Sequence, residues 1–200
     1  MTRICIVFLI FTAFIFTLSQ CMFTIQNYHA IRSLFLATNG YNWIWKNSSY
    51  GQIWNITANS TYQDACNLKW QGLNCSDRGL QGIELESYGL YGSIPTSFFN
   101  NVSSLTYFDV SGNNLTGYIP TSIASAKGLE YFIIQSNSFY GTIPSSLVTL
   151  TNLTYIFCWN NSIAGTLPVN FGNLIKLNTV NHFFRTEVYL FFTFDPYSPA

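Results

Sequence analysis

Hydrophobic and polar positions alternate over short stretches that recur along the middle of the chain. Four copies of a sixteen-residue pattern, starting 25, 24 and 24 residues apart, align without gaps: LQGIELESYGLYGSIP from Leu80, LTYFDVSGNNLTGYIP from Leu105, LEYFIIQSNSFYGTIP from Leu129 and LTYIFCWNNSIAGTLP from Leu153. Paired apolar positions predict a short strand with one buried face in each copy: 83/85, 108/110, 132/134 and 156/158. Such strands are too short to be stable alone, so we expect the copies to stack in parallel around one continuous core.

Each copy also carries residues that suit the turns between strands. Asn113, Asn137 and Asn161 stand where a buried side-chain amide can bond to backbone groups that would otherwise be unpaired, whereas the first copy has Tyr88 there. Cys158, at a buried strand position, is expected to be a small core residue. The glycines suit a positive φ or a close backbone approach, and the prolines fix an extended segment: Gly92, Gly117, Gly141 and Gly165, with Pro95, Pro120, Pro144 and Pro168.

Residues 24–78 are suited to cover the apolar edge of the first strand. Four residues at helical spacing predict an amphipathic helix that ends near Gly40, and three tryptophans follow it: Ile25, Tyr28, Ile31 and Phe35, then Trp43, Trp45 and Trp54. Cys66 and Cys75 are expected to pair if the chain is secreted. A metal site is the alternative for two close cysteines, but no second Cys or His pair stands at ligand spacing.

The repeat form LxxLxLxxNxLxGxIP resembles the plant-type leucine-rich repeat, and C-x3-W-x-G-x-x-C after LATNGYNW resembles the N-terminal cap of such proteins. The resemblance implies an α/β fold: a right-handed leucine-rich-repeat solenoid with a parallel sheet on its concave face and a helical, disulfide-bonded N-terminal cap. It also implies that Trp70 packs on the first repeat and that Cys66 bridges Cys75. We expect the cap over residues 24–78 and four repeats over 79–176.

The N-terminus, MTRICIVFLIFTAFIFTLSQC, has one Arg before an apolar run and resembles a secretory signal peptide over residues 1–20. An uncleaved membrane anchor is the alternative, because the run from Ile4 to Ile25 is nearly long enough to span a bilayer. Both place the domain in the secretory pathway, secreted or at the cell surface. Eight N-x-S/T sequons support this, although at Asn74 disulfide formation by the adjacent Cys75 competes with modification. Glycosylation is expected at Asn47, Asn55, Asn59, Asn101, Asn114, Asn152 and Asn160.

A degenerate repeat and an atypical tail are expected over residues 177–200. The fifth copy starts at Leu177 but places His182 at its second strand position and Arg185 at the ladder position, and no Gly-x-Ile-Pro follows. The aromatic tail FFTFDPYSPA either folds over this end as an improvised cap or marks the front of a longer protein, such as a receptor.

The composition argues against several functions. Charged residues are 8% of the chain and the net charge is zero, which disfavours a nucleic-acid groove. No Gly-rich phosphate loop, nucleophile elbow or Ser/His/Asp set is recognisable, so we expect neither an enzyme nor a cofactor. Glu84, Glu86 and Asp109 could cluster on the concave face, but without a deep pocket their pKa values need not be tuned for acid–base work.

The strand positions that alternate with the core are expected to form exposed columns on the concave face. One column is Gly82, Tyr107, Tyr131 and Tyr155; the next is Glu84, Asp109, Ile133 and Phe157; the third is Glu86, Ser111, Gln135 and Trp159. The face therefore changes from acidic near the cap to aromatic at the far end, and Tyr and Trp dominate binding hot spots. A generic solvated repeat surface is the alternative. Our candidate binding residues are Tyr107, Asp109, Tyr131, Ile133, Tyr155, Phe157 and Trp159.

These patterns predict a non-catalytic extracellular recognition module that binds a peptide, a protein or a glycan and needs no cofactor. The resemblance fits shorter family members that act as co-receptor ectodomains or small secreted recognition proteins. A secreted inhibitor of cell-wall-degrading enzymes is the alternative, although such inhibitors usually have more repeats. A membrane would be involved only through an uncleaved anchor or a further C-terminal part.

Overall fold

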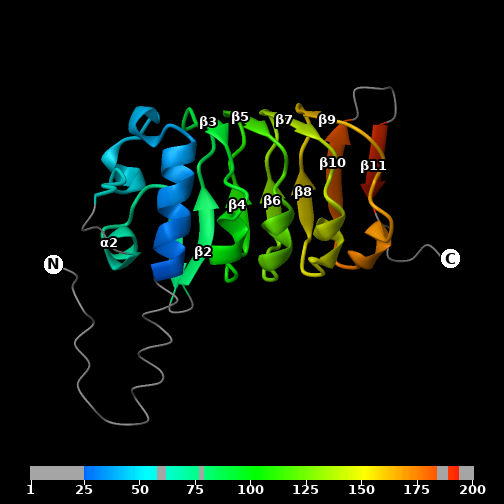
Figure 1. The fold of residues 1–200 in the computed structure, drawn as a ribbon, viewed down its shortest axis with the longest axis horizontal. Helices are drawn as coiled ribbons and strands as arrows, with labels where there is room; N and C mark the ends of the chain where they lie inside the picture. The colour runs from blue at the N-terminus through cyan, green and yellow to red at the C-terminus, as the bar shows by residue number, and fades with distance from the viewer. Residues whose placement is uncertain (1–24, 58–61, 77–78, 184–188, 194–200) are drawn as a thin grey trace, which may run out of the picture.

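The computed structural model describes residues 25–57, 62–76, 79–183 and 189–193, with side chains up to residue 180 except at 62–64. The expected signal peptide, Asn59, Arg185 and the last seven residues lie outside this part. Figure 1 shows the described chain as one row of stacked turns, from the N-terminal helix to β11.

A seven-stranded sheet runs through the molecule in the order β1-β2-β4-β6-β8-β10-β11. Its members are β1 (Leu73–Ser76), β2 (Gly79–Glu84), β4 (Tyr107–Asp109), β6 (Tyr131–Ile133), β8 (Tyr155–Phe157), β10 (Thr179–Phe183) and β11 (Tyr189–Thr193). The strands from β2 to β10 pair in parallel, each with the strand one repeat away. This confirms the parallel sheet expected from the repeat.

Each repeat also contributes one short strand to a second, four-stranded sheet, in the order β3-β5-β7-β9. Its strands are β3 (Tyr91–Ser93), β5 (Asn114–Gly117), β7 (Ser138–Gly141) and β9 (Ser162–Ile163), and short 3-10 helices follow: η3 (Phe98–Asn101), η4 (Thr121–Ser125), η5 (Ser145–Thr149) and η6 (Phe171–Asn173). The prolines accept the first hydrogen bond of these helices; for example, Ile123 N donates to Pro120 O. The four repeat glycines all have positive φ, as expected.

The core fills the space between these layers. Both members of every paired strand position are buried, from Ile83 and Leu85 in the first repeat to Ile156 and Cys158 in the fourth. Phe108 and Phe132 stack in adjacent repeats with ring centroids 6.0 Å apart. Identical positions thus meet at each step, which is how short strands acquire a shared core.

The asparagines at the turns form the expected ladder. Asn137 Nδ2 contacts the carbonyl oxygens of Val110, Ile134 and Gln135 at 2.9–3.2 Å, and its Oδ1 accepts from Leu115 N at 2.9 Å. Asn113 and Asn161 make the same set of contacts one repeat away in each direction. Each amide therefore ties its own turn to the preceding turn.

The cap begins with a helix over residues 25–37 and continues through η1 (Gly40–Asn42), η2 (Ser48–Tyr50) and α2 (Tyr62–Asn67). The helix is present as expected, and Ile31 and Phe35 are buried as predicted, but Ile25 is exposed and Asn27 is buried. Asn27 Nδ2 donates to Asn101 O and its Oδ1 accepts from Leu80 N, so a polar residue joins the helix to the first repeat. Asn39, with φ 61°, reverses the chain before Gly40.

Four tryptophans and a disulfide hold the cap together. Trp43 and Trp54 lie 4.9 Å apart, and Trp54 stacks on Trp70 at 6.0 Å. Trp70 is buried in the same core as the first repeat, in agreement with the expectation for this residue. Cys66 and Cys75 form a disulfide, which confirms their predicted pairing.

At the far end, the fifth copy still provides a parallel strand. β10 pairs with β8 in the register Thr179–Tyr155 and Val180–Ile156, and β11 then pairs antiparallel with β10. Part of the tail therefore lies along the last repeat strand. None of the helices in the described part of the chain has the length and hydrophobicity needed to cross a membrane.

Candidate functional site

A column of three tyrosines lies on the concave face of the long sheet. The parallel register places Tyr107 beside Tyr131 and Tyr131 beside Tyr155. Their ring centroids are 5.2 Å and 4.9 Å apart, and all three side chains are half-buried. Strands in a sheet are about 4.8 Å apart, so equivalent aromatic rings stack without any change in the backbone. The column is a continuous aromatic strip.

The neighbouring column is less exposed than the sequence suggested. Asp109 and Phe157 are half-buried, but Ile133 is only 8% exposed and Ser111, in the third column, only 3%. The expectation that the columns are exposed is wrong for Ile133 and Ser111, and also for Gly82 in the first column, which is buried. Neighbouring residues cover Ile133, and the Ser111 hydroxyl turns back to donate to Asp109 Oδ1 at 2.6 Å. Trp159 is half-buried as the far end of the third column.

Carboxylates gather around the cap end of the tyrosine column. Burial raises the pKa of Tyr107, and the negative charges of Asp109, Glu84 and Glu86 raise it further. All three carboxylates are therefore close enough to Tyr107 to influence its ionisation, which agrees with an acidic end of the face near the cap. Within the described ranges, no group of three or more His, Cys, Asp or Glu side chains is placed to hold a metal ion.

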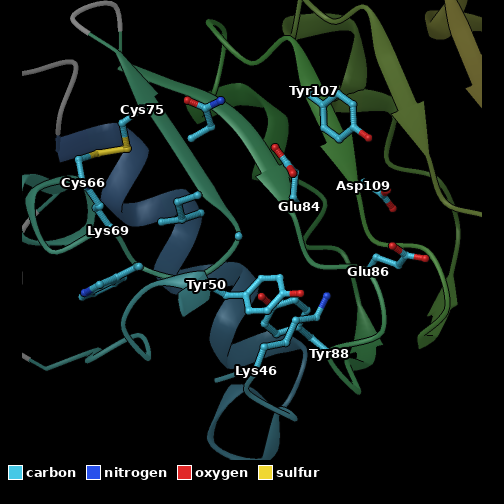
Figure 2. A pocket seen from close by; sticks show the side chains of 14 residues that line it. Lys46, Tyr50, Cys66, Lys69, Cys75, Glu84, Glu86, Tyr88, Tyr107 and Asp109 are labelled. Atoms are coloured by element: carbon cyan, nitrogen blue, oxygen red, sulfur yellow. A yellow bond between two sulfur atoms is a disulfide. The ribbon is translucent and has the colours of Figure 1, made fainter. Parts of the chain in front are cut away.

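The sequence did not predict that the cap forms a wall of this surface. A hollow of about 630 Å³ lies between the cap and the first two repeats, and we call it the cap cavity. The cap contributes Lys46, Tyr50, Cys66, Lys69, Trp70, Gly72, Leu73, Asn74 and Cys75; the repeats contribute Glu84, Glu86, Tyr88, Tyr107 and Asp109. Figure 2 shows the acidic side chains and Tyr107 on the side of the repeats, with Lys46, Tyr50 and Tyr88 grouped lower in the view.

Lys46 gives the cap cavity its most clearly placed cation. Its Nζ lies 4.8 Å from the ring centroid of Tyr88 and 5.4 Å from that of Tyr50, within the range of a cation–π contact. Burial raises the pKa of Tyr88, with further contributions from Tyr50 and Glu84. The sequence around Trp45 and Lys46 does not predict this cation–π contact, because the position of the loop depends on how the tryptophans pack beneath it.

The candidate glycosylation sites differ in exposure. Exposed members of the set are Asn47, Asn55, Asn114 and Asn160, whereas Asn101 and Asn152 are half-buried. The side chain of Asn152 is engaged on both sides, because it donates to Lys127 O and accepts from Lys176 Nζ. Asn160 follows Trp159 at the far end of the concave face, with φ 53°. Modification at these positions stays a prediction.

Comparison with known proteins agrees with this architecture. The Leucine Rich Repeat family matches residues 104–126 and 152–174. Among curated proteins, the LRR receptor-like serine/threonine-protein kinase GHR1 of Arabidopsis thaliana is 30% identical over 66 residues, which are 33% of this chain and 6% of that protein. The chain matches between 5% and 8% of the length of the curated relatives that resemble it.

Several solved structures of plant receptor ectodomains resemble most of the chain. The LRR ectodomain of the receptor kinase GASSHO1/SCHENGEN3 from Arabidopsis thaliana, in complex with CASPARIAN STRIP INTEGRITY FACTOR 2, has a TM-score of 0.59 and 28% identity, covering 79% of this chain and 17% of that one. The BIR3–SERK2 complex from Arabidopsis thaliana gives a TM-score of 0.62 and 26% identity, covering 76% and 78%. The chain therefore carries leucine-rich repeats, and its fold is similar to that of plant leucine-rich-repeat receptor ectodomains.

Proposed function

We propose that this chain is a non-catalytic recognition module, displayed at the cell surface or secreted, whose concave face binds a peptide or a segment of a protein. The observation that carries the proposal is the stacked, half-exposed column of Tyr107, Tyr131 and Tyr155. Tyrosine buries a large area at a low cost in rotamer entropy, and its hydroxyl can still bond to a polar backbone.

The similar ectodomains support a protein or peptide partner. The GASSHO1/SCHENGEN3 ectodomain was solved with CASPARIAN STRIP INTEGRITY FACTOR 2, and BIR3 with SERK2. The kinase names of the curated relatives do not support catalysis by this chain, because the matches cover only their leucine-rich-repeat portion. A glycan would be a different partner class and is an outcome of the test below.

The size of the face sets the strength of binding. Four strands about 4.8 Å apart span roughly 15–20 Å, and with a width of about 10–13 Å the face has an area on the order of 200 Å². A standard interface buries about 800 Å² per partner. We therefore expect weak binding by this face alone and tighter binding when it forms part of a composite interface. This fits a co-receptor or an ectodomain with further contacts.

The proposal is tested by selecting ligands for the immobilised full chain from a displayed random peptide library, with an oligosaccharide array in parallel. We expect enriched peptides that compete with one another for one site, with dissociation constants in the micromolar range or weaker. Absence of enrichment over a bare surface would contradict peptide recognition. Binding only on the oligosaccharide array would replace the peptide partner with a glycan.

A further inference from the structure

The aromatic column ends at Tyr107, at the edge of the cap cavity. The strand register places Gly82 beside Tyr107 in the position that Tyr131 occupies on the other side. Gly82 has no side chain and is itself buried, and a Cβ built there would lie 3.1 Å from Cβ of Asn74 and 3.8 Å from Cβ of Tyr107. One face of Tyr107 is therefore covered by Tyr131, at 5.2 Å between ring centroids, while the side toward the cap lacks a ring partner from β2.

Negative charge surrounds this end of the tyrosine column. Glu84 and Glu86 are exposed, and no ion pair within the described residues engages either carboxylate. Asp109 uses Oδ1 to accept from the backbone N and the hydroxyl of Ser111, at 2.8 Å and 2.6 Å. Its bonds to Ser111 fix the Asp109 carboxylate in place. The rim therefore has one fixed carboxylate, Asp109, and two solvated ones, Glu84 and Glu86, and no ion pair within the described residues neutralises them.

The opposite wall shows that the cavity accommodates a cation on a tyrosine ring. The ammonium of Lys46 lies over Tyr88 and Tyr50. Figure 2 shows this group apart from Tyr107, whose ring lies beyond Glu84. Tyr107 offers a comparable ring beside more carboxylates, and no cation–π contact of a described residue involves it. The geometry that Lys46 uses is therefore left unused at Tyr107.

We propose that the cap cavity binds the guanidinium or ammonium group of a basic side chain, placed against the ring of Tyr107 and bonded to Glu84 and Asp109. This inference rests on the proposed function, because the basic side chain would belong to the peptide partner of the concave face. Planar guanidinium suits both the ring and the carboxylates, so arginine is preferred to lysine. The cap cavity would then fix the position of the peptide along the tyrosine column.

The test is a titration of the full chain with N-acetyl-arginine amide, followed by NMR of the Tyr107 ring. N-acetyl-citrulline amide, which has nearly the same shape and no charge, is the control ligand. We expect saturable shifts in the millimolar range for the arginine probe and at least tenfold weaker binding of the citrulline probe. Equal binding of the two probes would overturn the proposal.

Three variants locate the interaction. Glu84→Gln should weaken the arginine probe about threefold and Glu84→Gln/Asp109→Asn at least tenfold; if the double variant loses its thermal transition, Glu84→Gln decides alone. Lys46→Met should raise the affinity for the arginine probe severalfold, because it removes a competing cation. A lower affinity in this variant would contradict a cation site. Glu130→Gln removes an exposed carboxylate outside the cavity and should change nothing.

The failure of this inference can be told apart from the failure of the proposed function. If the library yields no peptides but the arginine probe still binds at Tyr107, peptide recognition is wrong and the cation site stands. If peptides are enriched without basic residues, and their affinity does not change in Glu84→Gln, the cation site is wrong and peptide recognition stands.

Discussion

Each ladder asparagine replaces hydrogen bonds that a regular sheet would have provided. Where the chain leaves a strand, Asn137 donates to the backbone carbonyls of Val110, Ile134 and Gln135 and accepts from Leu115 N. Unpaired backbone groups are costly when buried. A single side chain at this position therefore stabilises its own turn and the preceding one.

Asn137→Ala should lower the free energy of unfolding by about 1–3 kcal/mol, because Leu115 N loses its acceptor and the carbonyls of Val110, Ile134 and Gln135 each lose one of their donors. Urea unfolding of the full chain measures this loss. Asn173→Ala is the control, since Asn173 is exposed and lies on η6 outside the ladder. Equal losses in the two variants would show that the ladder does not carry this role.

Cys158 makes stability depend on alkaline pH. Burial raises the pKa of its thiol from 9.0 to about 12. Between these values the unfolded chain releases the proton while the native chain keeps it, so the free energy of unfolding falls as the pH rises from about 9, and the stabilisation is complete only below about pH 9. Cys158→Ala should therefore show a shallower decline than the parent chain in urea unfolding at pH 8, 9, 10 and 10.5. Parallel curves would contradict this.

The strands could be predicted because the repeat fixes them twice, by alternation within a copy and by register between copies. The ladder asparagines and the positive-φ glycines followed from the same alignment. The second sheet and the 3-10 helices could not be predicted, since their two- to five-residue elements have no periodicity of their own. In the cap, helical spacing favoured Ile25, but tertiary contacts bury Asn27 instead.

The candidate site could likewise be predicted only in part. Columns such as Tyr107, Tyr131 and Tyr155 follow from register alone, so the sequence identified them. The low exposure of Ile133 depends on neighbouring side chains, and the cap cavity depends on how the cap loop packs against β2. Neither is encoded in a local pattern, which is why both required the structure.

The cap meets the first repeat through a close backbone contact. Gly92, in β3, has φ 126°, and a Cβ at this position would lie 2.1 Å from the carbonyl oxygen of Ala37. Tyr91 N donates to Thr38 O at the same contact. The end of the cap helix and the second sheet therefore depend on the absence of a side chain at residue 92.

Gly92→Ala should reduce the free energy of unfolding by at least about 2 kcal/mol, through backbone strain and a clash with Ala37 that separates the cap from the repeats. Gly172→Ala is the matched control, because nothing lies within 4 Å of its built Cβ and the change should stay within about 0.5 kcal/mol. Thermal or urea unfolding compares them. A neutral Gly92→Ala would mean that the cap contact is loose.

The whole solenoid presents one concave strip bounded by different structures at its two ends. The first end has the antiparallel strand β1 and the charged lining of the cap cavity; at the other end, β11 lies antiparallel on β10. The strip between them is aromatic and short. Specificity is then expected to come from the charged end and contact area from the tyrosines.

The central claim is that the concave tyrosine column, rather than aromatic residues elsewhere, carries recognition. Tyr118 provides the comparison, because it is 65% exposed and lies after β5 in the second sheet, away from the column. The most direct measurement is the affinity of a selected peptide for the parent chain, Tyr155→Ala and Tyr118→Ala, with unfolding curves to verify the fold. The account predicts at least a tenfold loss for Tyr155→Ala and an unchanged affinity for Tyr118→Ala. An unchanged affinity for Tyr155→Ala, or a loss confined to Tyr118→Ala, would contradict it.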